Sequence, residues 1–160
     1  MVAVVIGLLL TAGSPGPLSV TPFSLPSLRG GAPVSVPVVR HGTRYPVVVN
    51  FFASWCVPCQ TELPQVATVA DQLMSAGTKV AFVGVDGNDD PGSGLAFAEH
   101  AGVRFPIGAD HLSEVAPRLG VPGYPATVFI DASGHVADVV RGPVKPATLR
   151  HWALLIALPH

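Results

Sequence analysis

Apolar stretches separated by short Gly- and Pro-containing breaks give this chain its pattern. Runs rich in Val and Phe predict strands, and the two N-terminal runs flank residues 40–44, a polar segment typical of a hairpin connection. A second turn signal, the Gly-containing segment 131–134, joins two later runs. The predicted strands span residues 34–39, 46–53, 79–86, 127–130 and 135–140.

Longer segments with apolar residues every three or four positions predict helices. The first follows the strand 46–53 directly and ends at Gly77, a residue suited to a helix C-terminus. The last begins at Pro146, which the first turn of a helix tolerates. We expect helices over residues 56–76, 94–101, 113–119 and 146–158. The residues expected to face the core are Leu63, Val66, Val69, Ala70, Leu73, Leu149, Trp152, Leu155 and Ile156.

The order of these elements predicts an α/β fold. A hairpin precedes strands that alternate with helices, and a second hairpin and a helix close the chain. Such alternation favours a central mixed β-sheet with helices on both faces. A chain of 160 residues is long enough to bury one substantial core, so we expect a single domain over residues 23–160.

The N-terminus carries a different signal. Residues 2–10 form an unbroken apolar run, which is shorter than the ~20 residues that a membrane-spanning helix needs. Residues 1–13 are therefore interpreted as an apolar export signal or a truncated anchor, although no Lys or Arg precedes Arg29. The Pro-, Gly- and Ser-containing residues 14–22 are interpreted as a tether. The alternative is that the apolar run forms a buried strand of the domain.

Composition and charge exclude two classes of protein, nucleic-acid-binding domains and small disulfide-rich domains. The chain is 49% hydrophobic and 12% charged, with a formal net charge of -1. Nucleic-acid-binding domains present a basic footprint, and this chain has none, so we expect no nucleic-acid partner. The chain has 2 cysteines, too few for the disulfide framework of a small secreted domain.

The two cysteines, Cys56 and Cys59, stand two residues apart directly after an apolar strand. A strand that leads into Cys-x-x-Cys is typical of a thioredoxin-like redox site. Unpaired N–H groups at the start of a helix stabilise a thiolate, so Cys56 is the expected nucleophile and Cys59 the resolving thiol. Pro58 lacks an N–H that the first helical turn does not need. The alternative, a zinc half-site, lacks the four ligands of a closed site, so we expect no metal.

Glu62 and Pro64 follow on the same predicted helix. Glu62 lies one turn beyond Cys59, where a carboxylate near a thiol exchanges protons as the disulfide opens. The alternative is a solvated carboxylate on the helix surface. Pro64 falls within the helical pattern and predicts a kink. Further along, residues 121–127 contain two prolines just before a strand, and either X–Pro bond is a candidate for the cis form.

These motifs together resemble a known family. The chain is similar to thioredoxin-fold proteins of the extracytoplasmic, often membrane-tethered branch, the TlpA/ResA/DsbE type. The resemblance covers about residues 21–158 and includes the spacing of Glu62 and Pro64. The motifs that carry it are Val49-Asn50-Phe51-Phe52-Ala53-Ser54-Trp55-Cys56-Val57-Pro58-Cys59, Phe105-Pro106 and Gly123-Tyr124-Pro125-Ala126-Thr127-Val128-Phe129-Ile130-Asp131 followed by Gly134.

The resemblance implies roles for several residues. Pro125 would be a cis-proline against the active-site disulfide, and the Tyr124 backbone would pair with the bound substrate chain. Trp55 would border the substrate groove, or serve packing alone. Glu62 would be the acid–base group, because Asn50 stands where cytoplasmic thioredoxins carry a buried Asp. Residues 86–105 would form the family's central helix-and-strand insertion.

The leading functional hypothesis is an exported thiol–disulfide oxidoreductase that acts on cysteine pairs of other proteins and needs no cofactor. The resemblance implies a reducing role, such as keeping haem-binding cysteines of apocytochrome c reduced, and a membrane-bound thiol–disulfide donor or acceptor as partner. Some relatives instead oxidise folding proteins, and Val57-Pro58 does not settle the direction.

Two alternatives stand beside this hypothesis. The first is a copper-binding assembly factor that uses the two cysteines and His135, since thiolates suit Cu(I). The second is a redox-inert interaction domain on the same fold. The six histidines are otherwise interpreted as surface or structural residues.

Overall fold

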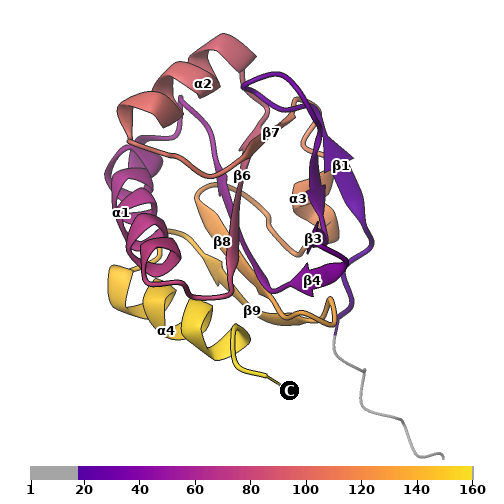
Figure 1. Cartoon of the computed structure of the whole chain (residues 1–160). Helices are drawn as coiled ribbons and strands as arrows, with labels where there is room; N and C mark the ends of the chain where they lie inside the picture. The colour runs from indigo at the N-terminus through magenta and orange to yellow at the C-terminus, as the bar shows by residue number, and fades with distance from the viewer. Residues whose placement is uncertain (1–17, 160) are drawn as a thin grey trace, which may run out of the picture.

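The computed structural model describes residues 18–159. Figure 1 shows a sheet that crosses the molecule, with helices packed along its sides. The strands are β1 (Phe23–Leu25), β2 (Val34–Val36), β3 (Val38–Arg40), β4 (Thr43–Tyr45), β5 (Val47–Phe52), β6 (Ala81–Gly87), β7 (Ile107–Asp110), β8 (Ala126–Ile130) and β9 (Val136–Arg141). The helices are α1 (Val57–Ser75), α2 (Pro91–His100), α3 (Val115–Arg118) and α4 (Pro146–Ile156).

The central sheet has five strands in the order β7-β6-β5-β8-β9. Strand β5 lies in the middle, parallel to β6 and antiparallel to β8, and all six of its residues are buried. A strand buried on both faces reads as a continuous apolar run, which explains why the sequence revealed it. The predicted mixed sheet of an α/β fold is confirmed.

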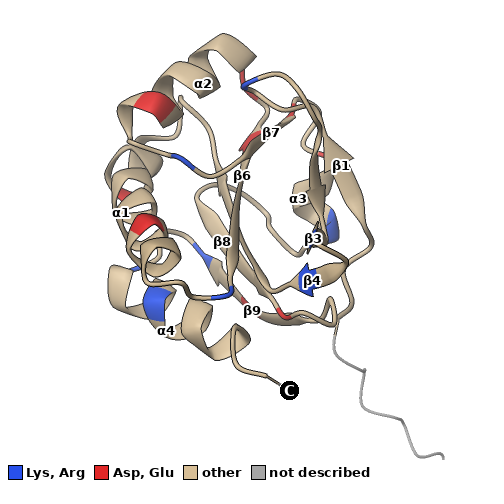
Figure 2. Ribbon diagram, in the orientation of Figure 1, with Lys and Arg blue, Asp and Glu red and all other residues tan. Residues whose placement is uncertain are grey.

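The sheet is covered on both faces. The core between the sheet and helices α1, α2 and α4 includes Phe52, Leu63, Phe129 and Leu149. The core on the opposite face packs α3 and the N-terminal strands against residues such as Val49. Figure 1 shows α1 and α4 side by side on one flank and β1 on the other. Figure 2 shows the charged residues of the described chain scattered over these elements.

The N-terminal strands differ from the prediction. The run 34–39 does not pair with 46–53, because it is divided at Pro37, which lacks an N–H for the ladder. Its first half, β2, pairs with β1, and its second half, β3, pairs with β4 across a turn at His41-Gly42. The run 46–53 enters the central sheet as β5.

Several element bounds also differ. Helix α2 starts earlier than predicted, at Pro91, because Asp90 accepts a hydrogen bond from the N–H of Ser93 and caps it. Strands β1 and β7 were not predicted, and α3 is only 4 residues long. The α1 core positions are buried as expected, but on α4 Leu155 is exposed and Ala153 is buried instead.

The predictions for residues 1–17 lie outside the described residues. Of the predicted tether, Leu18 and Val20 lie against the domain, where they hydrogen-bond to the backbones of Val136 and Gly134. Within residues 18–159, no helix has the length and hydropathy to cross a membrane.

Candidate active site

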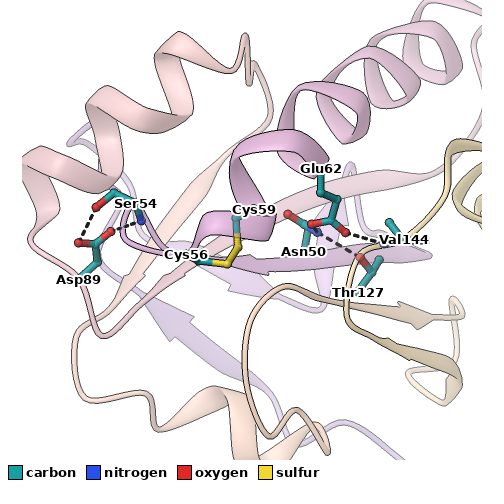
Figure 3. Close-up of a disulfide and its surroundings, with 8 residues drawn as sticks. All are labelled: Asn50, Ser54, Cys56, Cys59, Glu62, Asp89, Thr127 and Val144. Atoms are coloured by element: carbon teal, nitrogen blue, oxygen red, sulfur yellow. Dashed lines mark hydrogen bonds between the residues drawn. A yellow bond between two sulfur atoms is a disulfide. The ribbon is translucent and has the colours of Figure 1, made fainter.

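Cys56 and Cys59 form a disulfide with an S–S distance of 2.04 Å at the point where β5 leads into α1 (Figure 3). Cys56 is the residue that precedes the first turn of α1, and no side chain caps this end of the helix. Its residue surface is 3% exposed, against 0% for Cys59. Cys56 therefore lies at the N-terminus of α1, where the helix dipole favours a thiolate once the disulfide is reduced.

Helix α1 carries the other predicted residues of this segment. Pro58 lies in the first turn, which tolerates its missing N–H. The helix continues through Pro64, so the proline does not end it.

Glu62 is buried one turn beyond Cys59 on α1. Its Oε1 accepts a hydrogen bond from the backbone N–H of Val144 at 2.9 Å, and its Oε2 accepts a longer one from Asn50 Nδ2 at 3.5 Å (Figure 3). Burial raises the pKa of Glu62, and the two hydrogen bonds oppose this rise. A carboxyl group with a raised pKa holds a proton more readily, which suits it to take up and return one.

Asn50 links this carboxyl group to the neighbouring strand. Its Nδ2 also donates to the Thr127 hydroxyl at 3.1 Å, while its Oδ1 is buried without a partner among the described residues. The Glu62 side chain also borders a cavity of ≈ 430 Å³ whose lining includes Pro58 and Lys145.

Trp55 and Tyr124 lie together beside the disulfide-bearing turn. Their ring centroids are 5.9 Å apart, and Trp55 is 56% exposed. Both line a cavity of ≈ 220 Å³ that also includes Gly123. The Tyr124–Pro125 peptide bond is cis, as the resemblance implied, and Pro125 is buried.

A loop that the sequence analysis did not single out also contacts the site. Asp89, between β6 and α2, accepts hydrogen bonds from both the backbone N–H and the hydroxyl of Ser54 (Figure 3). The position of Asp89 in the sequence could have predicted this contact. Asp89 follows strand β6, and the carboxyl ends of neighbouring parallel strands share one edge of a sheet.

A second buried carboxyl group, Asp86, lies on β6 opposite Phe52 of β5. It is 1% exposed, and neither of its oxygens has a hydrogen-bond partner among the described residues. Burial, together with the nearby carboxylates of Asp89 and Asp90, raises its pKa to about 8. Asp86 is therefore mostly neutral at pH 7.

The copper site proposed from Cys56, Cys59 and His135 is wrong, because the histidine and the cysteines lie at opposite ends of the sheet. His135 follows the turn after β8, at the end of the sheet where Ile130 pairs with Val47. The cysteines follow the opposite end of β5, after Phe52. In the part of the chain that the structure describes, no group of three or more His, Cys, Asp or Glu side chains is arranged to hold a metal ion.

Comparison with known proteins agrees with this site. The chain is 36% identical over 98 residues to a thiol:disulfide interchange protein, a DsbE homolog of Paracoccus denitrificans, covering 61% of this chain and 51% of that protein. It is 32% identical over 105 residues to the thiol-disulfide oxidoreductase ResA of Geobacillus thermodenitrificans, covering 65% and 59% of the two chains. The chain thus spans between half and two thirds of the length of these relatives.

Solved structures that resemble this chain are also of thiol–disulfide proteins. The structure of DsbF from Mycobacterium tuberculosis is 33% identical, has a TM-score of 0.70, and matches 84% of this chain and 94% of its own. A thioredoxin family thiol:disulfide interchange protein from Chlorobium tepidum is 25% identical with a TM-score of 0.75, covering 91% and 99%. The model of the AhpC/TSA family matches residues 19–139. With this match across most of its length and a thioredoxin-like fold, the chain belongs to the AhpC/TSA family.

Proposed function

We propose that this protein is a thiol–disulfide oxidoreductase that exchanges disulfides with cysteine pairs of other proteins. The observation that carries the proposal is the Cys56–Cys59 disulfide at the start of α1, one helical turn from the buried carboxyl group of Glu62. The bridge closes a short loop, so it contributes little stability through chain entropy. Redox exchange gives a better reason for its presence.

In the reductive direction, the reaction consumes the dithiol form. The Cys56 thiolate attacks one sulfur of a substrate disulfide, and the other substrate sulfur leaves as a thiolate that takes up a proton. Cys59 then loses its proton to Glu62 and attacks the Cys56 sulfur. The second substrate thiolate leaves, the Cys56–Cys59 disulfide forms, and the substrate has gained two electrons and two protons. The oxidative direction reverses each step.

The surroundings of the disulfide support a protein substrate. Trp55 and Val57, on either side of Cys56, are 56% and 72% exposed and offer an apolar rim to an incoming chain. The Tyr124 backbone, preceding the cis peptide bond, is the proposed partner for the substrate backbone, and Pro125 shapes that contact. Desolvated apolar rims exclude water while the two sulfurs approach each other.

The proposal also covers the direction of disulfide exchange, the redox partner and the location of the protein. The names of the relatives, a thiol:disulfide interchange protein and a thiol-disulfide oxidoreductase, support the exchange reaction itself. From the family resemblance we propose the reductive direction, with a membrane-bound thiol–disulfide protein as electron donor. A disulfide oxidoreductase of 27% identity and TM-score 0.69 is described as secreted by Mycobacterium tuberculosis. We place this protein outside the cytoplasm, released or held by an N-terminal anchor.

The proposal is tested by trapping the mixed disulfide. In a Cys59→Ala variant the second step cannot occur, so Cys56 stays linked to the substrate. The reduced variant, mixed with a protein that contains one disulfide, is expected to give a covalent adduct that dithiothreitol dissolves. A Cys56→Ala variant is the matched control and gives no such adduct at the helix start. Equal adducts from both variants, or none from Cys59→Ala, would overturn the proposal.

A further inference from the structure

The carboxylate of Asp89 is joined to the turn that leads to Cys56 by two hydrogen bonds. The Ser54 backbone N–H donates to Asp89 Oδ2 at 2.5 Å, and the Ser54 hydroxyl donates to Oδ1 at 3.0 Å (Figure 3). In the next residue, the Trp55 indole N–H donates to the carbonyl of Asn88 at 2.9 Å. The loop between β6 and α2 thus holds two consecutive residues of the turn.

The loop that carries Asp89 is itself fixed at both ends. The Asn88 N–H donates to the carbonyl of Asp110 at 3.1 Å, which ties the loop to β7. The Asp90 N–H donates to Asp89 Oδ1 at 2.8 Å, and Asp90 caps α2 through the Ser93 N–H at 2.9 Å. The Asp89 carboxylate is therefore an anchored acceptor, and Ser54 is held in relation to the sheet.

Among the described residues, few other hydrogen bonds hold the turn. The Cys56 N–H donates to the carbonyl of Ala53 at 3.2 Å, and no side chain caps α1. Ala53 and Cys56 pack into the core, and the contacts of Ser54 and Trp55 fix the backbone between them. What fixes Ser54 also fixes the place of the Cys56 sulfur relative to the start of α1.

We propose that Asp89 is a positioning residue for the redox site: its carboxylate holds the Ser54–Trp55 turn so that the Cys56 sulfur is presented for in-line attack. This inference rests on the proposed function, since it concerns the same disulfide. Without Asp89 the turn samples other positions, and fewer encounters align the three sulfur atoms of the exchange.

Two substitutions separate the hydrogen bonds from the charge. In Asp89→Asn, the amide oxygen accepts the Ser54 N–H and Nδ2 donates to the Ser54 hydroxyl oxygen, so both contacts with Ser54 are kept, while the charge and the bond from the Asp90 N–H are lost. In Asp89→Ala both bonds and the charge are lost. The matched control is Asp90→Asn, which removes one charge from the same loop and keeps a residue suited to cap α2.

The readout is the oxidation of the reduced full-length protein by glutathione disulfide, followed by tryptophan fluorescence. Asp89→Ala is expected to react about tenfold more slowly than Asp89→Asn, since misplacement of reacting atoms has effects of this size. The Asp90→Asn control is expected to react at about the rate of the unsubstituted protein. Recovery of the rate in Asp89→Asn, which keeps both contacts with Ser54, is a readout that a loss of folding alone would not give.

A double-mutant cycle with Ser54→Ala completes the test. This substitution removes the hydroxyl bond alone, so it is expected to slow exchange a few-fold in the unsubstituted protein and not at all beside Asp89→Ala. Equal rates for Asp89→Ala and Asp89→Asn, or an unchanged Ser54→Ala effect in both backgrounds, would overturn the inference. If Asp89→Ala does not fold, an unaltered rate in Ser54→Ala overturns it. An unsubstituted protein that never reacts with glutathione disulfide would instead overturn the proposed function.

Discussion

Asp86 makes the stability of this protein depend on pH. Its carboxyl group is 1% exposed, has no hydrogen-bond partner among the described residues, and has a pKa raised from 3.8 to about 8. In the unfolded chain the same group ionises near its ordinary pKa. Between these two pH values the folded state binds one more proton at Asp86 than the unfolded state does, so stability falls as pH rises.

The size of this effect follows from the shift. Each pH unit inside the window between the two pKa values costs about 1.4 kcal/mol of unfolding free energy. Between about pH 5 and pH 7.5 the loss at Asp86 is thus about 3 kcal/mol, an upper limit because water penetration reduces it. The contribution is constant below the unfolded pKa and again above about pH 8.

The Asp86→Asn substitution removes the titration and keeps the shape of the side chain. Its unfolding free energy is expected to exceed that of the unsubstituted protein by an amount that grows with pH across this range. The assay is urea denaturation of the oxidised protein at a series of pH values, followed by tryptophan fluorescence. Glu99→Gln, which removes an exposed carboxyl group of α2, is the control. A difference between Asp86→Asn and the unsubstituted protein that stays constant with pH would show that Asp86 does not titrate in this range.

Two further predictions concern Glu62 and Gly87. Burial raises the pKa of Glu62, and glutamine cannot accept the Cys59 proton, so Glu62→Gln is expected to slow resolution of the mixed disulfide about 100-fold. Acid quenching and mass spectrometry measure the accumulated mixed disulfide, and unchanged kinetics would exclude Glu62 as the proton acceptor. Gly87 lies against the Tyr124 hydroxyl, which occupies the place of any added Cβ, so Gly87→Ala is expected to cost about 1–3 kcal/mol. Thermal unfolding measures this cost, with Gly123→Ala as the control, since no atom lies within 4 Å of a Cβ there.

The cysteine pair and its setting were predictable from the sequence because their signals are local. Strand β5 is apolar over its whole length, and the cysteines follow it within one turn, so the strand, the helix start and the thiols all lie in one short segment. The position of Glu62 follows from helical spacing alone. Its burial did not follow from spacing, which left a solvated carboxylate as an equal alternative.

The contacts that come from distant segments were not predictable in this way. Val144 donates to Glu62 from 82 residues away, and Asp89 reaches Ser54 from 35 residues away. Such pairings depend on how loops at one edge of the sheet meet. The hydrophobic periodicity of the sequence carries no information on contacts between distant loops. Pro37 shows a related limit, since a single proline divided an apolar run that otherwise predicts one strand.

The reduction potential of the disulfide shows whether Cys56 and Cys59 form a redox-active pair. The oxidised protein is equilibrated with glutathione or dithiothreitol buffers at neutral pH, and the dithiol fraction is measured by alkylation. We expect reversible exchange at a potential between about -120 and -270 mV, with the lower end indicating a reductase and the upper end an oxidant. A potential below about -300 mV, the range of structural disulfides, or a bond that no buffer reduces, would contradict the account.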